Sequence, residues 1–308
     1  MVLSARPLES DLQHGNVNIL IFFVVMAGLR AFAHERDWWA GLAIALAAAF
    51  KVTPALFLPY FAYKRQWRVV GGAMLGLVLF LLVLPGFVVG PVRNLELLAA
   101  WAEVYIRPYV IDGVVETLQI NQSLPGLFYR LFTKSPGIEF GDGTVLSVNW
   151  VNLDPNTARR VLSLLLLSVI VWLAWVCRAK IEDRRDWRWA CEFGMVFIAM
   201  LFISERSWKH HYVTMVLPYS AVVSYWVLRC DNKKGWWRVG TILLVSLLPY
   251  GQHQHRARGV AGSRERTQVC PGLWHVLFVW TCDLCRPFSN PVGTVSATSA
   301  VGKYKSRP

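Results

Sequence analysis

One apolar run in the chain is interrupted near its centre by a lysine and a proline. Residues 39–63 contain Lys51 as their only charged side chain, and Pro54 follows three positions later. A charged side chain within an apolar membrane segment costs free energy, so it is retained where it has a partner or a function. Proline removes a helical hydrogen bond and breaks the helix. The pattern therefore predicts a broken membrane helix with Lys51 at a functional position.

Further apolar runs follow one another along the chain as far as residue 250. Hydrophobic residues make up 55% of the sequence and charged residues 17%, whereas soluble domains contain about 25% charged residues. A helix of about 20 apolar residues can span a bilayer. We therefore expect an all-α, polytopic membrane protein, built as a helical bundle with one long external loop at residues 90–159.

The net charge of +13 is concentrated in short basic clusters between the apolar runs. Such clusters are typical of cytoplasmic loops, and they interact with anionic lipid headgroups. The charge therefore indicates topology and contact with membrane lipids, and no nucleic-acid partner is expected. The clusters are Lys64, Arg65 and Arg68, then Arg178, Lys180, Arg184, Arg185 and Arg188, and then Arg229, Lys233, Lys234 and Arg238.

Two structures are open for residues 39–63. The preceding connection, with Arg30 and Arg36, and the basic cluster at 64–68 both indicate the cytoplasmic side. A hairpin that enters and leaves on that side needs two half-helices, each about 18 Å long at a rise of about 1.5 Å per residue, with Lys51 at its tip. The alternative is one uninterrupted helix whose lysine faces neighbouring helices. We favour the hairpin, because both ends carry basic residues.

A second polar cluster lies between two later membrane segments, where residues 204–211 read Ser-Glu-Arg-Ser-Trp-Lys-His-His. Arg206, Lys209, His210 and His211 concentrate cationic and donor groups, which suit a phosphate ligand. Adjacent histidines cannot share one face of a helix, so only one of them should face a cavity. The alternative is a solvated turn whose long side chains reach water.

The external loop adds amide side chains and several carboxylates. Asn121, Gln122 and Ser123 form either a glycosylation sequon or a set of hydrogen-bonding groups for a hydroxyl-rich substrate. Residues 94–106 predict an amphipathic helix, lying on the membrane surface or packed on the bundle. A general base needs a carboxylate that reaches an acceptor hydroxyl. None of the external carboxylates is singled out by its setting; they are Glu96, Glu103, Asp112, Glu116, Asp142 and Asp154.

Four motifs, in this order and spacing, resemble glycosyltransferase family 87, polytopic enzymes of the GT-C fold. The resemblance covers roughly residues 6–250 and implies a polyprenyl-phosphate mannose or related donor, a lipid or glycan acceptor, and inverting transfer on the external face. It implies substrate-binding roles for Asn18, Lys51, Asn121 and Gln122, and a place near the donor phosphate for His210 and His211. Asn16 replaces the usual glutamine of the first motif. The motifs are Gly15-Asn16-Val17-Asn18, Ala49-Phe50-Lys51-Val52-Thr53-Pro54, Asn121-Gln122-Ser123 and Ser207-Trp208-Lys209-His210-His211.

The resemblance also sets expectations for both ends of the chain. The family's catalytic aspartate lies in a loop that precedes the first motif, so we expect an N-terminally truncated domain at 1–250 whose catalytic base is unknown. Asp11 lies too close to the first motif to replace it. After Gly251 the apolar periodicity stops, and residues 251–308 are expected to form an atypical, partly disordered tail. Cys282 and Cys285 give only a weak zinc pattern, so neither a metal nor a cofactor is expected.

Two further functions are compatible with these residues. A catalytically inactive membrane protein could bind a lipid phosphate, and it would need no external carboxylate in its cavity. A transporter could be built around a helix broken at Lys51, but transporters usually contain internal repeats. Segments 17–89 and 160–250 show no such repeat. We therefore favour the glycosyltransferase.

Overall fold

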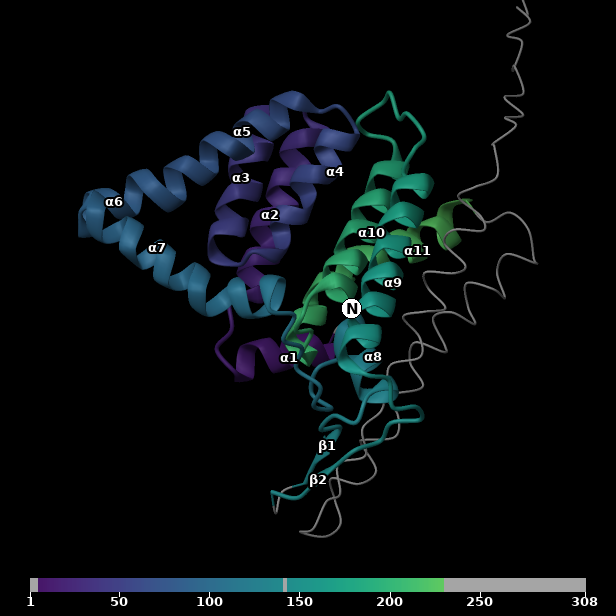
Figure 1. Cartoon of the computed structure of the whole chain (residues 1–308). Coiled ribbons are helices and arrows are strands. Elements are labelled where there is room, and N and C mark those ends of the chain that lie inside the picture. Colours follow the sequence, from purple (N-terminus) through teal and green to yellow (C-terminus); the bar gives the residue numbers. More distant parts are fainter. Residues whose placement is uncertain (1–4, 141–142, 230–308) are drawn as a thin grey trace, which may run out of the picture.

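The computed structural model describes residues 5–140 and 143–229 (Figure 1). These residues are predominantly helical, as the sequence predicts, and residues 230–308, with the whole of the expected tail domain and its cysteines, lie outside the described part. The helices are α1 (Ala5–Gln13), α2 (Asn18–Ala33), α3 (Asp37–Phe50), α4 (Phe57–Tyr63), α5 (Trp67–Leu77), α6 (Leu84–Val89), α7 (Pro91–Tyr105), α8 (Leu124–Phe132), α9 (Pro155–Val176), α10 (Trp187–Ile203) and α11 (Val216–Arg229).

Shorter helical segments join several of these helices. Two are 3-10 turns, η2 (Thr53–Leu56) and η5 (Lys209–Met215), and two are π-helical, η3 (Val78–Val83) and η4 (Arg107–Ile111). Since α5, η3 and α6 are continuous, they form one apolar helix from Trp67 to Val89. Among the described residues, this helix and α9 are long and apolar enough to cross a membrane.

The expected hairpin at residues 39–63 is confirmed, because one guanidinium group binds both of its ends. Arg184 Nη2 lies 3.1 Å from Asp37 Oδ2 at the start of α3 and 3.3 Å from Gln66 Oε1 beyond α4. The α3 helix therefore runs away from this end of the bundle, and α4 returns to it. Lys64 is held at the same end by Glu192, with Nζ 2.9 Å from Oε2. The basic clusters at 64–68 and 178–188 thus lie together, as expected.

Close backbone approach joins α3 to α5. A Cβ atom added to Gly41 would lie 2.2 Å from the Val69 carbonyl oxygen, and one added to Gly72 would lie 2.6 Å from that of Trp38. Only glycine fits these two positions, and small residues at a helix interface allow this kind of contact. The outgoing limb of the hairpin is therefore fixed against the long apolar helix.

Aromatic packing fixes the returning limb. Phe61 of α4 has its ring centroid 5.1 Å from that of Phe32 in α2, and Phe57 lies 5.2 Å from Phe197 in α10. All four side chains are fully or almost fully buried. The ring of Phe193 adds edge contacts to the rings of Phe32 and Phe57. The hairpin is therefore packed on both sides by rigid side chains, which hold its tip at one place.

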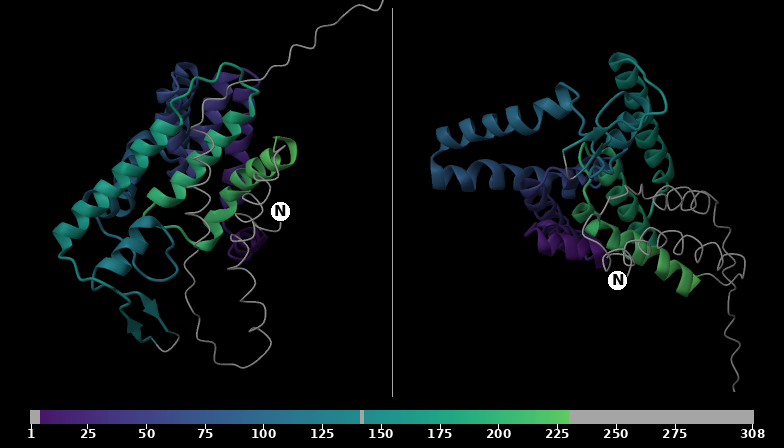
Figure 2. Two further views of the ribbon diagram at one scale, coloured as in Figure 1. Left: turned by 90° about the vertical axis from the view of Figure 1, so that its right-hand side faces the viewer. Right: turned by 90° about the horizontal axis from the view of Figure 1, so that it is seen from below.

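The long helix and α7 extend away from the rest of the bundle (Figures 1 and 2). Phe87 and Val88, where the chain turns back, are each 84% exposed. Helix α7 covers most of the segment predicted to be amphipathic, and it packs against α6 and η3 rather than on the main bundle. Several of its apolar side chains, among them Leu95 and Val104, are exposed among the described residues, so both the surface position and packing on the long helix stay open.

The loop expected to be external contains a small element that the all-α expectation lacks. Strands β1 (Ile138–Glu139) and β2 (Val145–Leu146) pair antiparallel, with Ile138 opposite Leu146. The turn that joins them includes Gly143 at φ +81°, a backbone conformation that favours glycine. Two residues in each strand are too few for a periodicity to be visible in the sequence.

Candidate substrate-binding site

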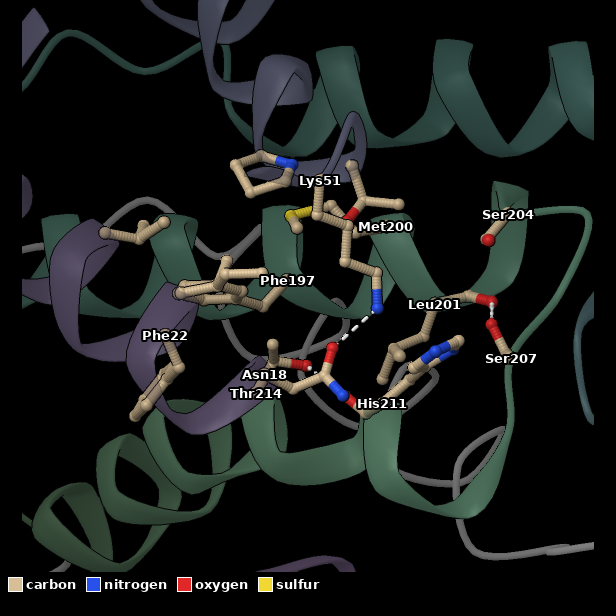
Figure 3. A pocket seen from close by; sticks show the side chains of 14 residues that line it. Asn18, Phe22, Lys51, Phe197, Met200, Leu201, Ser204, Ser207, His211 and Thr214 are labelled. Atoms are coloured by element: carbon tan, nitrogen blue, oxygen red, sulfur yellow. Dashed lines mark hydrogen bonds between the residues drawn. The ribbon is translucent and has the colours of Figure 1, made fainter. Parts of the chain in front are cut away.

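A pocket lies at the end of the bundle opposite the basic clusters, where α2 begins and the α3–α4 hairpin turns (Figure 3). Its empty volume is about 430 Å³, including its open mouth. One part of the lining is polar and the other is apolar, so the pocket suits a ligand with a charged head and a hydrocarbon chain. The polar lining residues are Asn18, Lys51, Thr53, Ser204, Ser207, His211 and Thr214, and the apolar ones are Ile21, Phe22, Val25, Pro54, Phe197, Met200 and Leu201.

Lys51 enters this pocket from the break in the hairpin. Helix α3 ends at Phe50, and Lys51 has an extended backbone with φ −153° and ψ 126°. Its ammonium donates a hydrogen bond of 2.7 Å to Asn18 Oδ1 at the start of α2 (Figure 3). Two residues expected in the site, 33 positions apart in the sequence, are therefore in direct contact.

Asn18 is itself held by Asp11, a residue that the sequence analysis set aside. Asn18 Nδ2 donates to Asp11 Oδ1 at 2.7 Å, and the Ile19 backbone N–H donates to Asp11 Oδ2 at 3.0 Å. Asp11 is 0% exposed. Both of its oxygens therefore accept hydrogen bonds from within the chain. The turn at Gly15, with φ +62°, brings α1 back against α2.

The two histidines occupy different positions, as expected for neighbours in a helical segment. His211 lines the pocket, whereas His210 is 8% exposed and its ring lies 6.0 Å from that of His14. Burial, with the charges of Lys51 and His210, lowers the pKa of His211 to about 3, so its imidazole is neutral near pH 7. Its Nδ1 lies 3.2 Å from the Trp208 backbone nitrogen. Nδ1 also lies 3.2 Å from the Arg206 carbonyl oxygen. In the tautomer in which Nδ1 accepts from Trp208, Nε2 carries the donor proton, whereas in the one in which Nδ1 donates to Arg206, Nε2 is an acceptor.

Asn121 and Gln122 lie behind the pocket and hold the 204–208 segment in place. The Asn121 side chain is 0% exposed, and its Nδ2 donates to the carbonyl oxygens of Glu116 and Glu205 at 2.8 and 2.7 Å. Its Oδ1 accepts from the backbone N–H of Ser207 at 2.9 Å. The Gln122 backbone N–H donates to the Ser207 carbonyl at 2.9 Å. These contacts position Ser207, which lines the pocket.

Arg206 lies at the surface beside the long loop at residues 106–123. Its Nε is 3.1 Å from Glu116 Oε2, and Nη2 donates to the hydroxyl of Tyr109. The guanidinium also lies 4.8 Å from the centroid of the Tyr109 ring. Arg206 therefore connects the loop after α7 to the segment that forms one wall of the pocket, and the structure does not bring it into the lining.

Two groups near this wall were not found from the sequence. Glu205 Oε2 and Trp208 Nε1 are buried, and neither has a hydrogen-bond partner among the described residues. Burial raises the pKa of Glu205 to about 7, although the charge of Arg206 opposes this rise. No spacing in the sequence distinguishes Glu205 from an ordinary loop carboxylate. Its environment depends on the fold of residues far away in the chain.

Comparisons with known proteins agree with this geometry. The sequence profile of glycosyltransferase family 87 matches residues 1–204. A polyprenol-phosphate-mannose-dependent α-(1-2)-phosphatidylinositol mannoside mannosyltransferase of Mycolicibacterium smegmatis is 29% identical over 230 residues, which are 73% of this chain and 46% of the relative. A pentamannoside mannosyltransferase of the same organism is 28% identical over 218 residues, or 68% of this chain and 43% of the relative.

A third relative differs in the sugar named. It is an α-(1→3)-arabinofuranosyltransferase of Corynebacterium glutamicum, 25% identical over 228 residues, which are 71% of this chain and 44% of the relative. The chain thus spans less than half the length of these three relatives. No solved structure matches the chain. Because the family profile covers about two thirds of the sequence, the chain belongs to glycosyltransferase family 87.

Proposed function

We propose that this chain binds a polyprenyl-phosphate sugar and takes part in transferring its hexosyl group, mannosyl first of all, to a lipid or glycan acceptor. The observation that supports this most is the pocket in which Lys51 and the neutral His211 lie beside an apolar wall. A phosphate needs several charge-assisted donors, and a polyprenyl chain needs hydrocarbon contacts. The family supports the reaction, and the names of two relatives support the mannosyl donor.

The proposed chemistry breaks the bond between the sugar's anomeric carbon and the phosphate oxygen. The acceptor hydroxyl oxygen forms the new bond to that carbon with inversion, and the electron pair leaves with the polyprenyl phosphate. Negative charge then grows on the leaving phosphate, where the Lys51 ammonium and the His211 N–H would stabilise it. The acceptor hydroxyl gives its proton to a base, and none of the residues described above is assigned this role.

We place this reaction on the external face of a multi-pass protein in the cell membrane, a bacterial inner membrane by analogy with the relatives. The basic clusters lie at the opposite end of the bundle from the pocket, which supports this orientation. Asn121 and Gln122 would act by holding the pocket wall. Arg206 would act at its rim, by attracting the anionic donor. Membrane lipids would contact α7.

A binding and transfer assay tests the proposal. The full chain in lipid nanodiscs is titrated with radiolabelled short-chain polyprenyl-phosphate mannose, and with the matching uncharged polyprenol as a control ligand. Lys51→Ala should weaken binding of the phosphate at least about tenfold, as expected for a hydrogen bond to a charged group. The matched control is Lys180→Ala, because Lys180 is exposed and its ion pair among the described residues is a surface contact with Glu182. It should bind as the wild type does.

Different outcomes separate the possible functions. Lys51-dependent binding together with a mannosylated lipid product supports the transferase. Lys51-dependent binding without product, when lipid acceptors and membrane extract are supplied, indicates a catalytically inactive protein that binds a lipid phosphate. If Lys51→Ala binds the labelled donor as tightly as the wild type, Lys51 is not part of a phosphate site and the proposal is wrong.

A further inference from the structure

Lys64, at the base of the hairpin, and Lys51, at its tip, differ in what their ammonium groups contact. Lys64 pairs directly with Glu192 at 2.9 Å and also donates to the carbonyl oxygens of Cys177 and Ala179, at 3.0 and 2.7 Å. All three of its N–H donors therefore have protein acceptors. Lys51 donates to the neutral Asn18 amide, and within the described residues no carboxylate forms an ion pair with it. The charge of Lys64 is neutralised in place, and that of Lys51 is not.

The orientation of the Asn18 amide decides which atom meets Lys51. An amide has a donor end and an acceptor end, whereas an ionised carboxylate only accepts. Because Asp11 Oδ1 accepts from Asn18 Nδ2 at 2.7 Å, the oxygen of Asn18 must point the other way, toward Lys51. Reversing the amide would bring N–H groups against the ammonium. Asp11 therefore determines the orientation of the Asn18 side chain without itself lying in the lining of the pocket.

We propose that Asp11 is a positioning residue for the phosphate site: it orients Asn18, and Asn18 holds the Lys51 ammonium in the pocket with its positive charge available to a phosphate. This inference rests on the proposed function. Asp11 acts as an anion separated from the lysine by one amide. A carboxylate in direct contact would neutralise the lysine and repel a phosphate, whereas the separated arrangement retains the lysine in the apolar surroundings.

A substitution and its reversal distinguish this role from simple structural support. In Asp11→Asn, the new side chain can still accept from the Ile19 N–H with its oxygen, so the contact with the start of α2 can persist. Its NH₂ group cannot accept from Asn18, so the Asn18 amide should turn and present donors to Lys51. In the double variant Asp11→Asn/Asn18→Asp, the hydrogen bond between positions 11 and 18 is restored in reverse, and the new carboxylate at position 18 meets Lys51 directly.

The expected results differ between binding and stability. Asp11→Asn should weaken binding of polyprenyl-phosphate mannose about tenfold and leave binding of the uncharged polyprenol unchanged. The double variant should have the thermal midpoint of the wild type, because the hydrogen bond between positions 11 and 18 is restored. It should still bind the phosphate ligand weakly, since the carboxylate at position 18 then neutralises Lys51. If the double variant regains both midpoint and affinity, or if Asp11→Asn binds like the wild type, Asp11 has no positioning role.

A readout without ligand separates failure of this inference from failure of the proposed function. The rate at which acetic anhydride acylates Lys51, relative to Lys64 in the same protein, is measured by peptide mass spectrometry. Asp11→Asn should change this ratio at least about threefold, because Lys51 loses its acceptor. A changed ratio in a protein whose wild type binds no donor would uphold the positioning role and refute the proposed function. An unchanged ratio would refute the positioning role whatever the ligand does.

Discussion

His210 and His211 are adjacent in the sequence and lie in different environments. The His211 ring lines the pocket, and its imidazole is neutral because burial lowers its pKa to about 3. The His210 ring packs perpendicular to it at 4.5 Å and faces His14 and Trp208 instead. Both lie in the 3-10 turn η5, in which one step of about 120° separates neighbouring side chains. The two residues should therefore contribute to different properties of the protein.

Alanine substitutions should reveal this difference. His211→Ala should weaken binding of polyprenyl-phosphate mannose about tenfold, because one donor to a charged phosphate is lost. His210→Ala should change that affinity less than about twofold and lower the thermal midpoint instead, because a buried ring is removed. Titration in nanodiscs and thermal unfolding of the same preparations measure both. Equal, negligible changes in affinity would mean that neither histidine contacts the phosphate.

Glu205 should make the stability of the protein depend on pH. Burial raises its pKa from 4.5 to about 7 in the folded protein, so the folded state binds more protons than the unfolded state between these values. The contribution of Glu205 to stability therefore falls as pH rises from about 4.5 to about 7. Relative to the wild type, Glu205→Gln should gain thermal midpoint steadily over this interval and no further above it.

The matched control for this measurement is Glu182→Gln. Its carboxylate is 81% exposed and, among the described residues, forms an ion pair with Lys180 on the surface, so the substitution should change the midpoint little. Melting curves of detergent-solubilised protein at about pH 4.5, 5.5, 6.5 and 7.5, which bracket the interval, give the comparison. A Glu205→Gln difference that does not vary with pH would show that this carboxyl titrates normally.

At the scale of single elements, the long apolar helix contains a proline whose cost is offset by α7. Pro85 lacks the N–H that would bond to the Leu81 carbonyl four residues earlier, and the helix is π-helical over Val78–Val83. Asn94 of α7 is 5% exposed and donates through Nδ2 to the Leu81 carbonyl at 2.8 Å. The amide from one helix therefore satisfies the acceptor that the proline leaves free in the other.

A double-mutant cycle tests this compensation. Asn94→Ala alone should destabilise the protein by about 1–3 kcal/mol, the cost of a buried carbonyl without a partner. In a Pro85→Ala background the backbone regains an N–H at this position that can bond to the Leu81 carbonyl, so the same substitution should cost clearly less. Denaturant unfolding in mixed micelles measures all four proteins. Strictly additive effects would mean that Asn94 packs against the helix without contributing a stabilising hydrogen bond to the Leu81 carbonyl.

At the scale of the whole molecule, the two ends of the bundle have separate tasks. One end holds Arg184, which donates to Asp37, Gln66 and the Phe32 carbonyl and so closes the base of the hairpin. The other end holds the pocket, with Lys51 at the tip of the hairpin. Because rigid helices packed by aromatic side chains join the two ends, we expect the base to support the fold and the tip to contact the proposed ligand.

Arg184→Gln should therefore affect stability more than binding. Loss of the guanidinium leaves Asp37 without its cationic partner in a site only 8% exposed, so unfolding should become easier by about 3 kcal/mol. Below the melting transition, the affinity for polyprenyl-phosphate mannose should stay within about twofold of the wild type. Arg185→Gln, at an exposed neighbouring position, is the control for both measurements. A large loss of affinity in folded Arg184→Gln would show that the two ends are coupled.

Local patterns in the sequence determined the helices, the break in the hairpin and the end at which its basic residues lie. Apolar runs predict helices because backbone groups must be satisfied internally in lipid, and Pro54 predicts the break after Lys51. The charge clusters predicted that residues 39–63 turn back, which the contacts of Arg184 confirm. Motif order also indicated the family. These features depend on residues near one another in the chain.

Only the tertiary structure decided which side chains meet. The contact between Asp11 and Asn18, the position of Asn121 behind the pocket and the bond from Asn94 to Leu81 follow no local spacing. Nor does the burial of Glu205 Oε2, which has no partner among the described residues. The same residue types are common in solvated loops, where they would have no such partners. Their roles arise because packing brings separate segments together and excludes water, and that changes both the hydrogen bonds a group can form and the cost of its charge.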